Sequence, residues 1–346
     1  MKNKLKFEQA INCITPRIQS ILEKLSDDTK ENTQEIRLRN EKPVMLIGSY
    51  GYLFLNGSGR ASYICTQTSL SIKSEELTDT FNRICKYSVH SNQSSIVNGY
   101  ITIEGGHRAG ICGTGVGDGQ SVASVRDISS INLRVASQCI GSSDEIINKL
   151  FRDGLKSVII AGAPLTGKTT ILRDMARQIS GGSLDRYYKT AIVDERKEIA
   201  AVKNGVPQND VGINCDVLDM YPKGTGIMSA LRSLSPEIII CDEVGDIDEI
   251  RAIEAGINSG VKFIASVHAE SYKDIIKRPQ IKSLVQSGAF DFLVLLKSGK
   301  DPGQISKIYG MDELTNEVSG NCIHYDFLCD GRTVFKPKII TKDKNT

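Results

Sequence analysis

One stretch restricts what this chain can fold into more than any other: Ser157-Val-Ile-Ile-Ala-Gly-Ala-Pro-Leu-Thr-Gly-Lys-Thr-Thr170. Its small and apolar first half predicts a short buried strand, and two glycines bound the loop that follows. The apolar residues after the loop recur at helical spacing from Ile171 to Ile179, which predicts a helix. We therefore expect a strand, a glycine-bounded loop and a helix in direct succession.

The loop matches the pattern Gly-x-x-x-x-Gly-Lys-Thr of phosphate-binding P-loops, in which backbone N–H groups and a helix N-terminus point at phosphate oxygens. We expect it to bind ATP, with Lys168 at the β- and γ-phosphates and the Thr169 hydroxyl on Mg²⁺. The alternative is a structural turn in which the glycines serve only the backbone. In that case the lysine and both threonines have no role. The expected nucleotide-binding residues are Gly162, Ala163, Pro164, Leu165, Thr166, Gly167, Lys168, Thr169 and Thr170.

Length and composition limit the class of protein. The 346 residues are enough for two domains, each with its own core. A net charge of +2 predicts no strongly basic face and disfavours nucleic-acid binding. No apolar run reaches the roughly 18 residues that a membrane span needs, and the N-terminus lacks a signal peptide's apolar core. The nine cysteines never form Cys-x-x-Cys, so they predict neither a zinc site nor a disulfide framework and indicate a reducing cytoplasm.

Residues 1–140 predict a smaller α+β domain. Residues 5–25 are predicted helical with an interruption at Thr15-Pro16, after which Pro16 begins a second helix. A further helix is predicted from Ser74, its expected cap, to about Tyr87. Gly105-Gly106 predicts a two-residue hairpin turn. Strict alternation within 35–39 places Ile36 and Leu38 inside. The predicted strands are 35–39, 43–48, 50–55, 100–104, 107–111 and 131–136, with a loop at 117–121.

From residue 141 the pattern changes to alternating strands and helices, which predicts an α/β fold with a mostly parallel sheet. Ser142 and Glu145 have the spacing of a helix-capping box. The strand candidates are 157–162, 190–194, 237–242 and 261–267, followed by antiparallel edge strands at 290–296, 305–309, 322–327 and 333–335. We assign 141–340 to this second domain and 341–346 to a tail.

Polar side chains stand where three of these strands end. Asp242 and Glu243 follow one strand, and we expect one carboxylate to support Mg²⁺ while the other polarises a water. Asp194-Glu195 and His268 end two further strands. Since the carboxyl ends of parallel strands line one crevice, these groups are expected beside the P-loop. A structural acid cluster and an ordinary hydrogen-bonded histidine are the alternatives. The expected metal ligands are Thr169, Asp242 and Glu243.

The order of these motifs resembles the bacterial type II/type IV secretion ATPase superfamily. Gly162–Thr169 matches its Walker A motif, Val193-Asp-Glu-Arg196 its Asp box, Asp242-Glu243 its Walker B motif and Ser266-Val-His-Ala-Glu270 its His box. Within the superfamily, the amino-terminal stretches resemble the stage III sporulation protein AA family of endospore-forming bacteria. Those stretches are Glu35-Ile-Arg-Leu-Arg39, Gly105-Gly-His-Arg-Ala-Gly110 and Ile131-Asn-Leu-Arg134.

The resemblance implies a RecA-like P-loop domain, an amino-terminal domain that packs over the nucleotide, and a hexameric ring. It implies a cytoplasmic ATPase at the membrane surface, associated with membrane-embedded sporulation channel proteins between mother cell and forespore. It carries catalytic roles over to Glu243, Asp194, Glu195 and His268, with Glu243 and Asp194 both open as the base. By the same resemblance, Arg108 and Arg134 are candidates to complete the site.

Two other functions compete with hydrolysis. Leu165 and Thr166 stand where many P-loops have small residues, and a positive φ there would strain them. This favours a nucleotide-gated scaffold that binds ATP to assemble and hardly turns it over. A RecA-like DNA motor is the other alternative, and the near-neutral charge argues against it.

Overall fold

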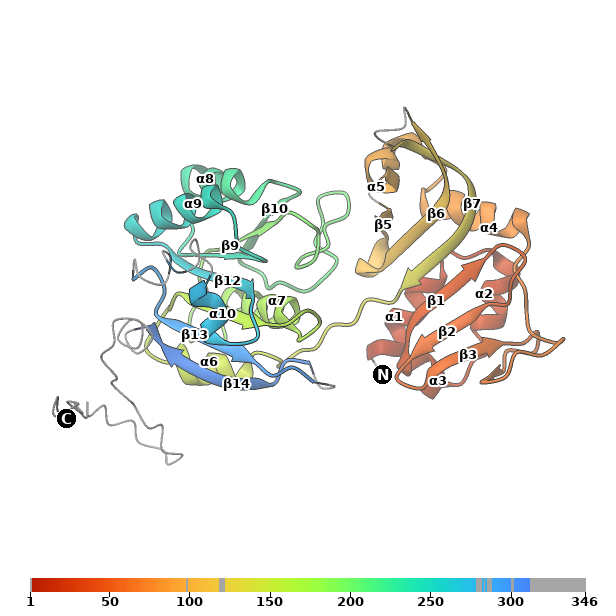
Figure 1. Ribbon diagram of the computed structural model, residues 1–346, viewed down its shortest axis with the longest axis horizontal. Helices are drawn as coiled ribbons and strands as arrows, with labels where there is room; N and C mark the ends of the chain where they lie inside the picture. The colour runs from red at the N-terminus through yellow and green to blue at the C-terminus, as the bar shows by residue number, and fades with distance from the viewer. Residues whose placement is uncertain are drawn as a thin grey trace, which may run out of the picture. The chain divides into compact units, whose positions relative to one another are not determined.

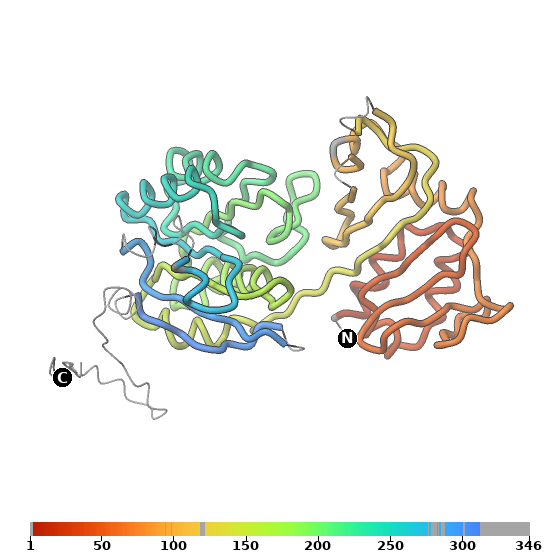
Figure 2. The backbone as a smooth tube through the Cα atoms, viewed as in Figure 1, coloured from red at the N-terminus to blue at the C-terminus, as the bar shows by residue number. Residues whose placement is uncertain are grey.

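The computed structural model describes residues 2–97, 99–117, 122–277, 282, 284, 288–299 and 302–311 (Figures 1 and 2). Its contacts divide the chain into two compact units, which are described separately. The first comprises Met1–Gln138 with Ala201–Asn209, and the second comprises Cys139–Ala200 with Asp210–Thr346. No helix in the described ranges combines the length and the apolar character that crossing a membrane would require.

The first unit contains an antiparallel sheet of order β4-β3-β2-β1-β7-β6-β5. Its strands are β1 Thr33–Arg39, β2 Met45–Gly48, β3 Gly51–Leu55, β4 Ala61–Ser62, β5 Tyr100–Thr102, β6 Arg108–Gly117 and β7 Val122–Arg134. Its helices are α1 Lys2–Ile11, α2 Pro16–Leu22, α3 Asp27–Asn32, α4 Ser74–Ile84 and α5 Gln93–Val97, with 3₁₀ turns η1 His90–Asn92 and η2 Glu104–Gly106. Ile36 and Leu38 are fully buried, as their alternation predicts.

Two local predictions for this unit are wrong. Ser74 is the first residue of α4 and not its cap; Lys73 is the cap, and its N–H donates to the Glu76 carboxylate at 2.9 Å. The helix ends at Ile84 because Lys86 and Tyr87 take left-handed φ values of 49° and 58°. The hairpin turn spans Glu104–Gly106, one residue more than predicted, with the Ile103 N–H donating to the His107 carbonyl at 2.9 Å. The predicted loop at 117–121 lies almost wholly outside the described residues.

The second unit contains a sheet of order β10-β9-β11-β12-β8-β13-β14, parallel except for β14. Its strands are β8 Val158–Gly162, β9 Thr190–Asp194, β10 Cys215–Asp219, β11 Ile238–Cys241, β12 Lys262–His268, β13 Phe292–Leu296 and β14 Ile305–Gly310. Its helices are α6 Asp144–Leu150, α7 Lys168–Ser180, α8 Lys223–Ser233, α9 Ile247–Asn258 and α10 Tyr272–Lys277. Helices α8 and α9 pack on one face of the sheet, whereas α6 and α7 lie on the other (Figure 1).

The mostly parallel sheet confirms the predicted fold class, with two differences. β10 was not predicted, because the edge strand Cys215–Asp219 alternates with acids and is only partly buried. The predicted antiparallel edge is confirmed by the pairing of β13 with β14, but β13 also pairs in parallel with β8, so among the described strands of this sheet only β14 runs in the opposite direction. The predicted strands at 322–327 and 333–335, and the tail, lie outside the described residues.

A buried carboxylate joins the P-loop helix to the helix before it. The Oδ2 atom of Asp174 on α7 accepts from the N–H and hydroxyl of Ser143 at 2.9 and 2.8 Å, and Oδ1 accepts from Arg177 at 2.7 Å. Ser143 is the N-cap of α6, so the predicted cap at Ser142 is wrong by one residue. Burial would raise the pKa of Asp174, but the hydrogen bonds from Ser143, Arg177 and Gln178 outweigh it and hold the pKa below its ordinary value.

Asp174→Asn is expected to lower the free energy of unfolding by about 1–3 kcal/mol, because the amide keeps one acceptor oxygen and turns an NH₂ group toward the donors of the other. A carboxyl with a depressed folded-state pKa stabilises the fold above its unfolded pKa of about 3.9, and this stabilisation is lost as the pH falls through the folded value. Urea unfolding of both proteins from neutral to acid pH should show the difference shrinking toward acid. A difference independent of pH would contradict this account.

Candidate active site

The glycine-bounded loop joins β8, an inner strand of the parallel sheet, to α7. Gly162 ends β8, and a side chain there would bring its Cβ to 2.4 Å from the Thr166 hydroxyl. Gly167 caps α7 with a left-handed φ of 92°, and a Cβ on it would meet the Gly303 nitrogen at 2.8 Å. Both glycines are therefore required where they stand, one by a close approach and the other by its backbone conformation.

Leu165 and Thr166, the two loop residues that a positive φ would strain, differ in their backbone conformation. Leu165 has a φ of 65° and its side chain is 93% exposed, so its left-handed backbone costs about 1–2 kcal/mol without burial to offset it. Thr166 has no positive φ; it is buried, and its hydroxyl donates to the Ala163 carbonyl at 2.8 Å. The strain is therefore confined to Leu165.

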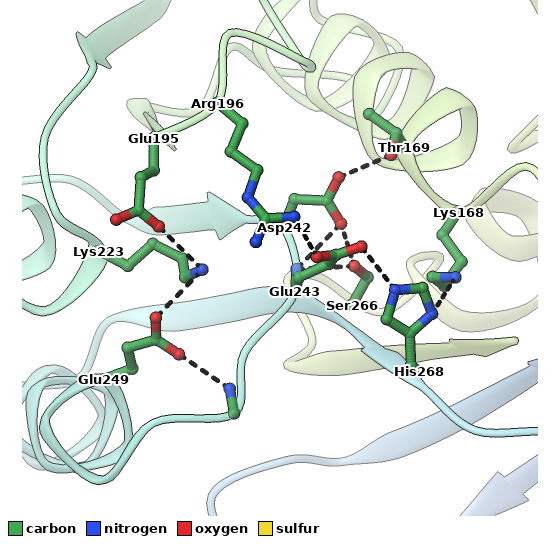
Figure 3. A network of polar contacts seen from close by, with 11 residues as sticks. Lys168, Thr169, Glu195, Arg196, Lys223, Asp242, Glu243, Glu249, Ser266 and His268 are labelled. Carbon is green, nitrogen blue, oxygen red and sulfur yellow. Dashed lines mark hydrogen bonds and ion pairs between the residues drawn. The ribbon is translucent and has the colours of Figure 1, made fainter. Parts of the chain in front are cut away.

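Lys168, the first residue of α7, is buried with its ammonium group inside the loop. Its Nζ donates to the Gly162 and Ala163 carbonyls at 3.0 and 2.9 Å and lies 3.1 Å from His268 Nδ1 (Figure 3). Burial lowers the pKa of Lys168, and the carboxylates of Asp242 and Glu243 oppose that effect. The ammonium is thus held between the ends of β8 and β12.

The next residue of α7 reaches the acid pair. The Thr169 hydroxyl donates to Asp242 Oδ2 at 2.6 Å, and the Ser266 hydroxyl from β12 donates to Asp242 Oδ1. A hydroxyl beside a carboxylate oxygen at a helix N-terminus offers the hard oxygen ligands that Mg²⁺ prefers, with phosphate oxygens and water completing its shell. Thr169 and Asp242 therefore fit a magnesium ion.

Glu243 stands at the centre of the network. Its Oε1 lies 2.6 Å from His268 Nε2, and its Oε2 accepts from Arg196 Nη1 at 2.7 Å (Figure 3). Burial would raise the pKa of Glu243, but His268, Arg196 and Lys168 outweigh it, so the pKa lies below its ordinary value. Glu243 is therefore an anion at neutral pH, which is the form that accepts a proton. His268 touches both Lys168 and Glu243.

The other two strand-end acids have different partners. The carboxylate of Asp194, 2% exposed, accepts backbone N–H groups from Glu198 at 2.7 Å, Ile199 at 3.3 Å and Ala200 at 2.8 Å. Arg173 on α7 donates to the carbonyls of the same turn, to Ile199 at 2.8 Å and Glu198 at 2.6 Å. Asp194 therefore organises the turn after β9.

Glu195 points to a buried lysine. Lys223 Nζ lies 3.1 Å from the carboxylates of both Glu195 and Glu249 (Figure 3). Burial would lower the pKa of Lys223, but the two glutamates raise it above its ordinary value. Lys223 and Glu249 were not singled out in the sequence, and the position of Lys223 at the start of α8, after Pro222, was the only signal for it.

The two arginines of the first unit have partners within that unit. Arg134 on β7 lies directly opposite Arg108 on β6 and Glu35 on β1. Its Nε donates to Glu35 Oε1 at 3.0 Å, whereas the Arg108 guanidinium lies 4.9 Å from the centre of the Tyr100 ring. These arginines therefore form a row across one face of the antiparallel sheet.

A central parallel sheet, a glycine-bounded loop before α7 and an acid pair after β11 define a RecA-like P-loop domain. With the antiparallel unit before it, the fold is that of the secretion ATPases. The Legionella pneumophila ATPase DotB superposes with a TM-score of 0.55 at 16% identity, covering 88% of this chain and 84% of that one. The pilus retraction motor PilT with bound ADP gives a TM-score of 0.50 at 13% identity, covering 76% of this chain and 74% of that one.

The chain belongs to the family described as sporulation stage III, protein AA, whose profile matches residues 4–315. The stage III sporulation protein AA of Bacillus subtilis (strain 168) is 38% identical over 280 residues, which cover 81% of this chain and 87% of that protein. The resemblance inferred from the motifs is thereby confirmed. The chain is thus a member of a sporulation family that has the fold of secretion and pilus ATPases.

Proposed function

We propose that this protein is a Mg²⁺-dependent ATPase that works as a hexameric ring and energises a sporulation-associated channel complex between mother cell and forespore. One observation carries the ATPase assignment: Lys168, Glu243 and His268 form one connected network at the phosphate loop. Family membership supports the link to sporulation, and the secretion ATPase fold supports the ring. The proposed location is cytoplasmic, on the inner face of the membrane complex, with membrane-embedded channel proteins as partners and no nucleic acid.

The binding roles follow from the contacts. Lys168 would exchange the Gly162 and Ala163 carbonyls for phosphate oxygens, while the N-terminus of α7 directs backbone N–H groups at the same anion. Thr169 and Asp242 would hold Mg²⁺, which neutralises charge on the phosphates. The ADP bound to PilT supports an adenine nucleotide as the ligand.

For the reaction, Glu243 is the favoured base. Water attacks the γ-phosphorus, Glu243 accepts the proton of that water, and the bond between the γ-phosphorus and the ADP oxygen breaks. Asp194 was the other candidate, but its carboxylate is buried under three backbone N–H groups, whereas the Glu243 side chain is 28% exposed and its partners are side chains. His268 contacts both Lys168 and Glu243, so it would transmit the presence of the γ-phosphate to the base.

Arginines would complete the site. An arginine finger contributes roughly 10³ to 10⁵ in rate, so a P-loop domain that lacks one hydrolyses slowly. Arg108 and Arg134 are the proposed residues from the first unit, and Arg196 already touches Glu243.

A nucleotide-gated scaffold is the second candidate. Leu165 favours it, because this large and exposed side chain with a left-handed backbone stands where many P-loops have small residues. The local partners of Arg108 and Arg134 also favour it, since Tyr100 and Glu35 already contact these two guanidinium groups.

Mass in solution and phosphate release, measured on one sample, separate the two functions. With Mg·ATP we expect a ring and steady phosphate release, and with ATP plus a magnesium chelator we expect release to stop. A ring that forms with Mg·ATP but releases no phosphate would establish the scaffold. If ATP changes neither the molecular mass in solution nor the amount of phosphate released, both proposals fail.

A further inference from the structure

Ser266 on β12 contacts three consecutive residues at the end of β11. It is fully buried, its hydroxyl donates to Asp242 Oδ1, and the same hydroxyl accepts the Glu243 N–H at 2.9 Å (Figure 3). Its carbonyl accepts the Val244 N–H at 2.9 Å. A serine hydroxyl has one proton to donate, so donating to Asp242 while accepting from Glu243 fixes its orientation.

The backbone that Ser266 holds is strained. Glu243 has a φ of 49°, in the left-handed region that costs a residue with a side chain about 1–2 kcal/mol. Such conformations persist only where surrounding contacts enforce them. Here the enforced turn directs the Glu243 carboxylate to His268 and Arg196.

Ser266 also divides the two oxygens of Asp242. With Oδ1 held by Ser266, Oδ2 faces Thr169 at 2.6 Å, where a metal ion would be bound. Without the hydroxyl, the carboxylate could rotate about its terminal bond, and the Glu243 N–H would keep only Asp242 Oδ1 as an acceptor, at 3.0 Å.

We propose that Ser266 is a positioning residue: one buried hydroxyl sets both the metal-facing oxygen of Asp242 and the left-handed backbone of Glu243. The inference rests on the proposed ATPase function and assigns to β12 a task besides carrying His268. In the sequence, Ser266 lies two residues before His268, so both side chains point to one face of the strand.

Ser157 provides a matched control. It is 1% exposed, and its hydroxyl accepts a backbone N–H from β12, that of Phe263, at 3.2 Å. This contact lies at the opposite end of the strand from His268. Ser157→Ala and Ser266→Ala thus each delete a buried hydroxyl that is in contact with or on β12, and only Ser266 touches the acid pair.

The test compares wild type, Ser266→Ala, Ser266→Thr and Ser157→Ala. For Ser266→Ala we expect kcat to fall about 10- to 100-fold, because a small misplacement of a reacting group has an effect of that size. We expect the Mg²⁺ concentration for half-maximal phosphate release to rise several-fold, while nucleotide binding in a magnesium chelator is unchanged. Ser266→Thr keeps the hydroxyl, so its kcat and its Mg²⁺ requirement should both be close to those of wild type. Ser157→Ala should change neither value, although we expect urea unfolding to show that it is less stable than wild type.

Equal losses of kcat in the two alanine variants, or an unchanged Mg²⁺ requirement in Ser266→Ala, would overturn the proposal. If wild type binds Mg·ATP but releases no phosphate, the ATPase assignment fails by itself. The Ser266 proposal is then decided by the Mg²⁺ concentration that half-maximal ATP binding requires. A several-fold rise in Ser266→Ala over wild type supports the proposal, and an unchanged concentration overturns it.

Discussion

Glu243→Gln is expected to stop phosphate release while ATP remains bound. Glutamine keeps the shape of the side chain but cannot accept a proton from water, and a positioned base contributes about 10²- to 10⁴-fold to a rate. The substitution also removes the negative charge that pairs with His268 and Arg196. Lys168 and Thr169 are untouched, so affinity for Mg·ATP should change little. Single-turnover phosphate release and equilibrium binding of ATP would measure the two effects separately.

Asp194→Asn is the control for this prediction, because it makes the same change in the other candidate base. The Asp194 carboxylate accepts three backbone N–H groups, and an amide would turn its NH₂ group toward some of those donors. We therefore expect a loss of stability in urea and a smaller effect on the rate. If Asp194→Asn instead abolishes turnover with its stability intact, while Glu243→Gln remains active, the base is Asp194.

Lys168→Ala is expected to have the second large effect, the loss of nucleotide binding. Removing a buried charged partner costs about 2–5 kcal/mol of binding free energy, which raises Kd roughly 30-fold to several-thousand-fold. The same change removes the contacts of the ammonium with the Gly162 and Ala163 carbonyls and with His268. Titration with a fluorescent ATP analogue measures the loss directly.

Lys149→Ala is the matched control for Lys168→Ala. Lys149 is an exposed lysine on α6 whose ammonium pairs with Glu145 on the same helix, so its loss should leave Kd unchanged. An unchanged Kd for Lys168→Ala would show that the loop does not bind the nucleotide through its lysine. Unchanged turnover in both Lys168→Ala and Glu243→Gln would end the enzyme proposal.

The sequence predicted those parts of the fold that depend on short-range patterns. Burial at every position of Val158–Gly162 and alternation in β1 are visible in the order of residues, and both occur in the structure. The direction of β13 was not readable, because a run of apolar residues is the same in a parallel and an antiparallel strand. The partly exposed edge strand β10 had too weak an apolar pattern to be recognised.

In the candidate site, too, short-range patterns predicted some features and not others. Motif spacing singled out Lys168, Asp242 and Glu243 from the sequence alone, and their roles remain predictions. What spacing could not predict is which side chain uses its hydrogen bonds on the backbone. Asp194 and Glu243 both end a strand, yet one supports a turn and the other faces His268. That difference depends on the path of the next few residues, which no local pattern specifies.

The contacts that Arg173 and Asp194 make with the turn after β9 connect α7 to the candidate base. Arg173 on α7 and Asp194 on β9 hold the same residues, Glu198 and Ile199, and that turn begins next to Arg196, which grips Glu243. A displacement of α7 would therefore be passed from Arg173, in its second turn, through the shared turn to Arg196 and the Glu243 carboxylate. The proposed nucleotide-binding helix and the proposed base are therefore connected through the protein itself and not only through a bound nucleotide.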